Sequence, residues 1–442
     1  MLEEIVKDDV HSIKASNQPL FDVSTDFAAL REQQDALVAK WKALGVAERM
    51  QYTDIEDFKT KAGLPNLKSD ILQPARNFYL ISSEVQARLR SQDDLRLLPI
   101  EGIDFDDSVI ELAESLENVP DIRELYRLRK KTVGKSANSG INAEEALRLK
   151  NCFSQGRELY LAGRNGSLMV KPLNFFYAMT AYAYGIIVLN NPLRFNKGNL
   201  PGSHGLGYLP DVVQAQFGGD VARGTFSDLV TSFPTQLVKG INLEMHLDCT
   251  ESILSYYENR FSVSLGTLLS IVPEMAAYYK LTTGLSSRCF PLEIVSANDP
   301  RSLKWEFRIG NGEIRPRPSS IDESFPGFES SERFGKTVVI VPAGDIHRLR
   351  SCIYSDTYGN FWFIDNPFFP VILPEIAVNF LISYIFSNIM RYRPDEWGNV
   401  LTNDVPSNVS LLTRHYFSSL QRKFFILVLR SISRYIPYVT QN

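Results

Sequence analysis

The chain has 442 residues, of which 44% are hydrophobic and 22% are charged, and these proportions exclude a wholly disordered protein. Its net charge of -4 at pH 7 excludes nucleic-acid binding over the whole surface but is compatible with a local basic patch. The acidic N-terminal residues MLEEIVKDD lack an apolar core, which predicts no signal peptide. The four cysteines have no paired spacing: Cys152, Cys249, Cys289 and Cys352. We therefore expect no metal site, no disulfide framework and no cofactor, and we expect the protein to be in the reducing cytoplasm.

Residues 1–145 are predicted to form an acidic helical extension. Residues 1–150 carry 21 Lys and Arg against 27 Asp and Glu. Helical patterns cover Phe27–Leu44, Ile71–Leu98 and Ile103–Leu128, the last of them broken at Pro120. Lys130–Gly140 is basic, small and polar, as linkers are, which places a domain boundary at 145. The charged faces are solvated helix surfaces in one interpretation and an arm that docks a partner protein in the other.

Two helices and a polar loop are predicted between Cys152 and Leu206. Phe153–Arg164 has an amphipathic pattern, and Asn165-Gly166 is expected to end it with a left-handed cap. Ser167 then suits the N-cap of a second helix. From Leu173 to Leu189 no residue is charged, so we expect this helix to be covered by protein on nearly every side. The run is shorter than the roughly 20 residues that span a bilayer, which favours a core helix over a membrane segment.

After the N-terminal extension, the chain is predicted to contain helices over 146–285, a small β insertion over 290–366 and C-terminal helices over 374–436. Within the first part, 206–233 is expected to be loop with one brief helix, and Ser264–Tyr279 two short helices or a kinked one because of Pro273. Alternating and β-branched runs predict the strands of the insertion: Leu303–Ile309, Thr337–Pro342, and a hairpin of Leu349–Tyr354 with Phe361–Ile364.

The last part contains two more helical patterns, Pro374–Tyr392 and Ser407–Tyr435. Pro374–Tyr392 is apolar on most faces, so we expect the C-terminal helices to pack back on the Leu173–Leu189 helix. The fold class that results is mainly α, a helical bundle with a small inserted antiparallel sheet and a helical N-terminal extension. Together, 146–442 are predicted to form one domain.

Two motifs stand out in this second part. The first is a Pro-Leu-x-x-Phe-Tyr helix after a small-residue break, followed by a His-Gly-Leu loop: Tyr160, Pro172, Leu173, Phe176, Tyr177, His204, Gly205 and Leu206. The second is a Ser-x-x-x-Arg-Tyr-x-Pro-x-x-Trp signature within Ile385–Trp397. In this order the two motifs resemble those of the YaaC-like family of bacterial proteins. More distantly, two antiparallel helices before a Ser-His loop look like HEPN helical domains, which include ribonucleases and toxin partners.

His204 is the main candidate catalytic residue, because it lies in a Gly- and Ser-flanked loop and histidine titrates near neutral pH. The alternative is that His204 pins the loop by hydrogen bonds to backbone carbonyls. Arg391, Arg393 and Trp397 are candidate binding residues, since two arginines beside an aromatic ring can hold a phosphate or a base. Their structural alternative is that the arginines satisfy helix-end carbonyls and Trp397 covers them.

Three functions are compatible with these features. The first is a binding or effector component, which the HEPN likeness extends to a defence-type or nucleic-acid-related system. The second is a metal-independent nuclease that uses His204 with an arginine, although the Arg-to-His spacing of HEPN ribonucleases is absent here. The third is a structural subunit. We expect the chain to bind a protein partner or to self-associate, and we expect no association with a membrane. Nucleic acid could bind to the basic residues of the C-terminal helix: Arg414, Arg422, Lys423, Arg430 and Arg434.

Overall fold

The computed structural model describes residues 36–45, 49, 96–102, 105–132, 141–190, 202–233, 235–240, 243–299, 302–402, 404, 407–432 and 435–440. The chain divides into two compact units, Met1–Gln92 and Asp93–Asn442. In the first unit, residues 36–43 are helical, within the predicted Phe27–Leu44 helix; the rest of that prediction lies outside the described residues. The boundary predicted at 145 falls within the second unit, and the division into domains stays a prediction.

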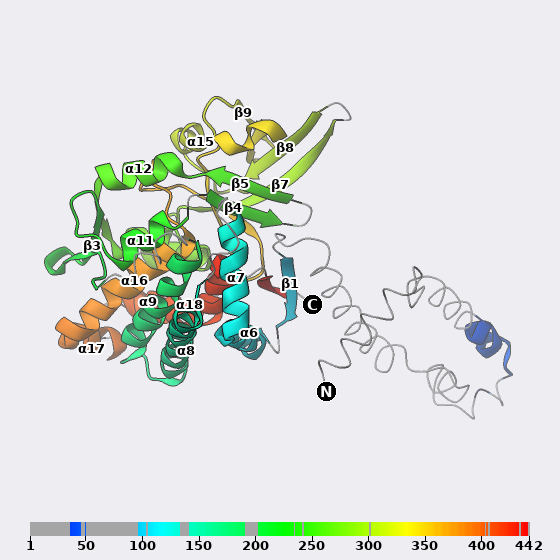
Figure 1. Cartoon of the computed structure of the whole chain (residues 1–442). Helices are drawn as coiled ribbons and strands as arrows, with labels where there is room; N and C mark the ends of the chain where they lie inside the picture. The colour runs from blue at the N-terminus through cyan, green and yellow to red at the C-terminus, as the bar shows by residue number, and fades with distance from the viewer. Residues whose placement is uncertain are drawn as a thin grey trace. The chain divides into compact units, whose positions relative to one another are not determined.

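The second unit begins with a strand that pairs with the last strand of the chain. Strand β1 (Arg96–Glu101) runs parallel to β13 (Tyr435–Thr440) (Figure 1). Both strands correct helical predictions, because Ile71–Leu98 was expected to stay helical to its end and the last helix to reach Tyr435. The remainder of Ile71–Leu98 lies outside the described residues. The local pattern failed here because each strand is stabilised by hydrogen bonds to a segment far away in the sequence.

Two helices follow β1 and contribute to the main hydrophobic core. They are α6 (Phe105–Glu114) and α7 (Val119–Thr132), joined by the 3-10 turn η2 (Ser115–Glu117). The break therefore precedes Pro120, which sits in the first turn of α7, where a missing N–H costs nothing. Phe105 and Tyr126 are fully buried in the core that the later helices share.

The helix-break-helix prediction is confirmed. Helix α8 (Ala143–Asn165) starts at a capping box of Asn142 and Glu145, and α9 (Lys171–Asn190) follows after a short turn. The cap between them is not left-handed, since Gly166 has a φ of -76° and donates its N–H to the Ala162 carbonyl at 2.9 Å. The two helices pack closely, because a Cβ on Gly185 would lie 2.1 Å from the ring of Phe153.

The C-terminal helices cover α9, as predicted. They are α16 (Glu375–Tyr392), α17 (Pro394–Thr402) and α18 (Ser407–Ile432), and α9 lies among α8, α16 and α18 (Figure 1). The ring of Phe175 stacks with Phe417 and Phe424 of α18, and Phe176 meets Phe380 of α16 edge-on. Among the described helices α9 alone is long and apolar enough to cross a membrane, but 78% of its apolar window is buried, as in a core helix.

The region after α9 contains more β-structure than predicted. A three-stranded antiparallel sheet is formed by β2 (Gly207–Leu209), β3 (Gln214–Gly218) and β6 (Arg260–Ser264), with η3 (Pro210–Val212) inside it. The expected brief helix is α11 (Thr225–Thr231). A second hairpin, β4 (Thr235–Gly240) with β5 (Leu243–Asp248), leads into α12 (Thr250–Glu258). Pro273 divides the next helices as predicted: α13 (Leu265–Ser270), η4 (Pro273–Met275) and α14 (Ala276–Thr283).

The inserted sheet is antiparallel, as predicted, but it is larger than a small insertion. Its six strands have the order β11-β12-β7-β8-β10-β9, and they have a hydrophobic core of their own with α15 (Pro318–Ser324) against it. The predicted strands and the predicted hairpin are all present. The bounds are β7 (Cys289–Asp299), β8 (Ser302–Ile309), β9 (Ser330–Arg333), β10 (Lys336–Pro342), η5 (Ala343–Arg348), β11 (Cys352–Ser355) and β12 (Phe361–Ile364).

Candidate functional site

The loop that carries His204 is fixed by its backbone. It leads into β2 and lies against the start of α11, where Phe226 donates its N–H to the His204 carbonyl at 2.9 Å and Thr225 donates to Ser203 at 2.9 Å. Gly205 has a φ of +69°, and a Cβ there would lie 2.6 Å from the Gly224 nitrogen. Both the backbone conformation and the close approach therefore require glycine. The loop is pinned by main-chain contacts, so the imidazole itself is not needed to hold it.

The imidazole of His204 packs among aromatic rings. Its centroid lies 4.9 Å from Phe176 edge-on, 6.4 Å from Tyr177 and 6.3 Å from Tyr384. Nδ1 is buried without a hydrogen-bond partner in the described part of the chain. Burial, and then the positive charge of Arg391, lower the pKa of His204 below its ordinary value. The ring is therefore neutral at pH 7, with Nε2 as the nitrogen available to a ligand.

Arg391 comes to this ring from the last turn of α16. Its Nε donates to the Ser387 carbonyl at 3.2 Å, and its guanidinium lies 4.9 Å from the centre of the Tyr392 ring. The structure thus brings His204 and Arg391 together closely enough for the charge of one to act on the pKa of the other. Because the two residues belong to the two separate family-like motifs, the motifs meet at this point of the fold.

Arg393 and Trp397 are engaged in structural contacts. Arg393 donates to the Pro210 carbonyl at 2.9 Å and pairs with Glu396 at 2.6 Å. Trp397 is 1% exposed and donates its indole N–H to the Met169 carbonyl at 3.1 Å. These contacts correspond to the packing alternative, since the arginine satisfies a carbonyl at η3 and the indole fills the core. Both side chains are held by other parts of the fold, and their binding role stays a prediction.

Two tyrosines complete the cluster and were missed from the sequence. Tyr384 packs against His204, and its hydroxyl faces the Leu206 carbonyl at 3.5 Å. Tyr208 stands edge-on to Tyr384 at 6.3 Å, and its buried hydroxyl has no partner among the described residues. The sequence did contain a signal for Tyr384, because Tyr384 and Arg391 are two helical turns apart and therefore share one face of α16. We call His204, Tyr208, Tyr384 and Arg391 the His204 cluster.

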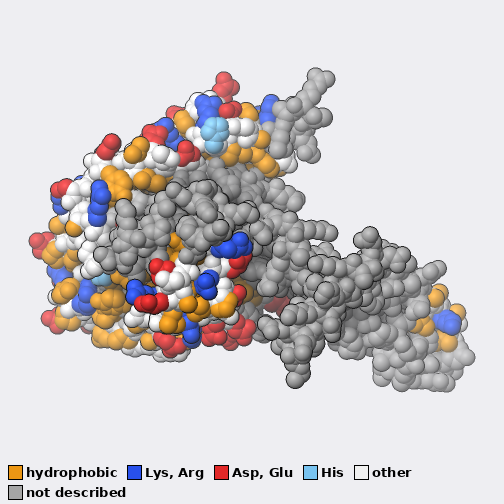
Figure 2. All heavy atoms as spheres, in the orientation of Figure 1, with side chains coloured by type: hydrophobic (Ala, Val, Ile, Leu, Met, Phe, Trp, Pro, Cys, Tyr) orange, Lys and Arg blue, Asp and Glu red, His pale blue; other side chains and the backbone are white. Residues whose placement is uncertain are grey.

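Not all of the basic residues of α18 lie on the solvent-exposed surface. Lys423 is 2% exposed and pairs with Glu274 at 2.7 Å and with Glu375. Arg430 lies beside Glu375, and it donates to the Ser355 carbonyl at 3.2 Å. Arg414 caps the Leu401 carbonyl at 2.5 Å, and Arg434 lies outside the described residues. On the face drawn in Figure 2, described acidic and basic side chains are interspersed. Nucleic-acid binding by this helix stays a prediction that relies mainly on exposed Arg422.

Neither a metal nor a thiol centre is formed by the described residues. Within those residues, no group of three or more His, Cys, Asp and Glu side chains is placed to hold a metal ion. The four cysteines are free, and three of them are buried. Burial raises the pKa of Cys249 to about 11 and that of Cys352 to about 12, so both are protonated thiols at neutral pH.

The fold and the cluster define a mainly helical protein in which an apolar helix, a histidine loop and an arginine-bearing helix are packed together, and in which an inserted sheet has a core of its own. The family model of the YaaC-like proteins matches residues 114–432, and the chain belongs to this family. The match includes both motifs, α7 and the whole inserted sheet. No curated protein matches the chain. No solved structure matches it either, and the likeness to HEPN helical domains stays a prediction.

Proposed function

We propose that the chain is a binding component whose His204 cluster receives the phosphate group of a nucleotide or of a nucleic acid. The observation that carries this proposal is the neutral His204 imidazole, with its buried and unpartnered Nδ1, beside the guanidinium of Arg391. An unpartnered Nδ1 favours the tautomer that carries the proton on Nε2, because an unpaired acceptor is less costly to bury than an unpaired donor. Nε2–H and Arg391 then both act as donors, and phosphate oxygens are strong acceptors.

The test separates ring packing from ring chemistry. His204→Phe keeps an aromatic ring against Phe176 and Tyr384 but removes both nitrogens, and Arg391→Gln removes the charge. We expect each change to weaken binding of a fluorescent single-stranded oligonucleotide, or of fluorescent AMP, by about tenfold, the value of one lost charged hydrogen bond. Arg148→Gln is the control, because Arg148 is an exposed arginine of α8 with 66% of its side chain accessible.

The two sources of phosphate give different results in this assay. Oligonucleotide affinity should fall steeply as salt rises, because binding releases counterions from several phosphates. AMP has one phosphate, and its affinity should change much less. Equal binding by the unaltered chain, His204→Phe and Arg391→Gln in both arms would refute the proposal.

A nuclease is the second candidate, and the same neutral histidine favours it. A neutral imidazole beside a guanidinium has the groups for general acid–base attack on a phosphodiester without a metal. Labelled RNA should then be cut in the presence of EDTA, and His204→Phe should abolish cleavage while its melting temperature stays near that of the unaltered chain. Intact RNA after prolonged incubation would exclude this function. The effector role in a defence-type system and the role of structural subunit stay predictions from the sequence.

A further inference from the structure

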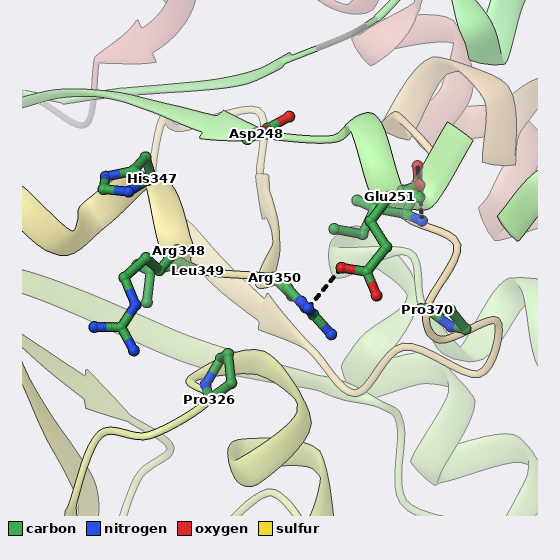
Figure 3. A pocket seen from close by; sticks show the side chains of 10 residues that line it. Asp248, Glu251, Pro326, His347, Arg348, Leu349, Arg350 and Pro370 are labelled. Carbon is green, nitrogen blue, oxygen red and sulfur yellow. Dashed lines mark hydrogen bonds and ion pairs between the residues drawn. The ribbon is translucent and has the colours of Figure 1, made fainter. Parts of the chain in front are cut away.

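A cavity of about 330 Å³ lies between the junction of β5 with α12 and the segment that follows η5 (Figure 3). Two carboxylates line one side, from Asp248 and Glu251. Three basic side chains line the other, from His347, Arg348 and Arg350. None of these residues belongs to the His204 cluster, and none was singled out from the sequence. A cavity of this size is within the range of small-ligand sites in proteins.

The basic side of the cavity is centred on Arg350. Leu349, which precedes it, is fully buried in the core of the six-stranded sheet. The backbone N–H of Arg350 donates to the Ser324 carbonyl at 3.0 Å, and the buried Ser351 hydroxyl donates to the same carbonyl at 3.2 Å, so the backbone that carries Arg350 is fixed. Figure 3 shows the guanidinium of Arg350 pointing toward Glu251 and that of Arg348 pointing away, where Arg348 pairs with Asp345 at 3.4 Å and lies over the Phe328 ring at 5.1 Å.

The acidic side is equally ordered. An oxygen of Asp248 accepts hydrogen bonds from the Thr250 N–H at 2.8 Å and from its hydroxyl at 2.7 Å. These bonds, together with the charge of His347, lower the pKa of Asp248, so it stays ionised. Ser252 and Ile372, which also line the cavity, are joined by a hydrogen bond, because the buried Ser252 hydroxyl accepts the N–H of Ile372 at 2.7 Å.

One ion pair spans the cavity. Figure 3 shows Arg350 reaching Glu251, with 2.5 Å between them, and the two side chains are 41% and 57% exposed. Ion pairs at this level of exposure are weak. An incoming anion can therefore replace Glu251 on Arg350, which frees the Glu251 carboxylate to accept from another part of the same ligand.

We propose that this cavity binds a small phosphate monoester that carries a hydrogen-bond donor, an ammonium or a hydroxyl group, at its other end. The phosphate would lie on Arg350 in the place that Glu251 now occupies, since a guanidinium group matches phosphate oxygens in a bidentate geometry. The donor end would lie on Asp248 and Glu251, because ionised carboxylates only accept hydrogen bonds. The separation of the two charges across one cavity is what selects a ligand with two unlike ends.

Calorimetric titration of the full chain with O-phosphoethanolamine, inorganic phosphate and ethanolamine tests this assignment. We expect O-phosphoethanolamine to bind at least about tenfold more tightly than phosphate, and ethanolamine to give no signal. Arg350→Gln should weaken binding of O-phosphoethanolamine by about tenfold on the same grounds. Arg315→Gln is the matched control, because Arg315 pairs with Glu332 at the same 2.5 Å and with a similar exposure of 39% and 69%, outside the cavity.

Glu251→Gln distinguishes the two ends of the ligand. The change removes the anion that competes for Arg350, so inorganic phosphate should bind several-fold more tightly, as expected for the loss of one weak charge pair. It also removes an acceptor for the ammonium group, so the preference for O-phosphoethanolamine over phosphate should shrink. The assignment is overturned if the unaltered chain binds neither phosphate compound. It is also overturned if Arg350→Gln leaves binding unaltered, or if Glu251→Gln leaves the preference intact.

Discussion

Lys423 lies within α18 with 3% of its side chain exposed, between the carboxylates of Glu274 and Glu375. Burial opposes the charge, but the two carboxylates raise the pKa of Lys423 above its ordinary value. A raised lysine pKa stabilises the fold below the unfolded value of about 10.4, and this contribution is lost as the pH rises through the folded value. The ammonium therefore contributes fully at neutral pH.

We predict that Lys423→Ala lowers the free energy of unfolding at pH 7 by about 3–5 kcal/mol, because it leaves Glu274 without the cation it pairs with and Glu375 with only Arg430, 3.8 Å away. The neighbouring Arg422→Ala is the control, since its side chain is exposed and its loss should change stability by less than about 0.5 kcal/mol. Urea unfolding followed by circular dichroism measures both. A loss for Lys423→Ala as small as that for Arg422→Ala would contradict the prediction.

The candidate site was predictable in part. His204 and Arg391 were selected from the sequence, and the fold brings them together. Lys423 shows why the rest was missed: in the sequence it is one of several cations spaced along a helix, and only packing reveals that Glu274 and Glu375 surround it. Tyr208 was missed for a similar reason, since it comes near Tyr384 only once β2 has formed. Pairings between distant segments leave no local pattern to read.

At the scale of elements, Asp365 joins α15 to the end of β12. Its carboxylate accepts from Arg317 at 2.7 Å and from the Ser320 hydroxyl at 2.5 Å, and it pairs with Arg288 at 3.1 Å. Burial alone would raise the pKa of Asp365, but these hydrogen bonds and charges hold it below its ordinary value. A lowered carboxyl pKa stabilises the fold above the unfolded value of about 3.9, and this contribution is lost as the pH falls through the folded value.

We predict that Asp365→Asn lowers the free energy of unfolding at pH 7 by about 1.5–3 kcal/mol, the value of hydrogen bonds to a charged group. The difference from the unaltered chain should shrink as the pH falls below about 4, because the unfolded chain then binds a proton at this carboxyl and the folded chain binds it only at a lower pH. Denaturant midpoints measured from pH 7 to pH 3 give both quantities. Glu332→Gln, in the exposed pair with Arg315, is the control and should have a small effect at every pH.

The elements that were predicted correctly are those with strong local patterns. The apolar run of α9, the amphipathic α8 and the β11–β12 hairpin each depend on neighbours within one element or one turn. The three-stranded sheet was missed because β3 pairs with β6 across α11, β4, β5 and α12. The size of the inserted sheet was underestimated for a different reason, since β9 is a short, fully exposed strand whose polar residues resemble a loop.

At the scale of the whole molecule, the second unit includes helices that precede the linker predicted from the sequence. Phe105 of α6 and Tyr126 of α7 have no exposed surface, and they share the main core with α8 and α18. We predict that a chain beginning at Asp93 unfolds in one cooperative transition. A chain beginning at Gly140 should lose that transition, because removal of these side chains leaves cavities that each cost about 3–5 kcal/mol.

Differential scanning calorimetry compares the two shortened chains with the full one. A cooperative transition at an unchanged temperature in the chain from Gly140 would show that α6 and α7 are dispensable, and would favour the boundary predicted at 145. The chain from Asp93 also tests the docking-arm prediction: loss of a partner in a pull-down, with the transition intact, would support an interaction through the first 92 residues.

The pairing of β1 with β13 has a consequence for synthesis on the ribosome. Arg96 leaves the exit tunnel long before its neighbour in the sheet, Tyr435. This pairing cannot form until the helices and the inserted sheet that lie between the two strands in the sequence have been synthesised. Translation therefore makes the union of β1 with β13 a late step of assembly.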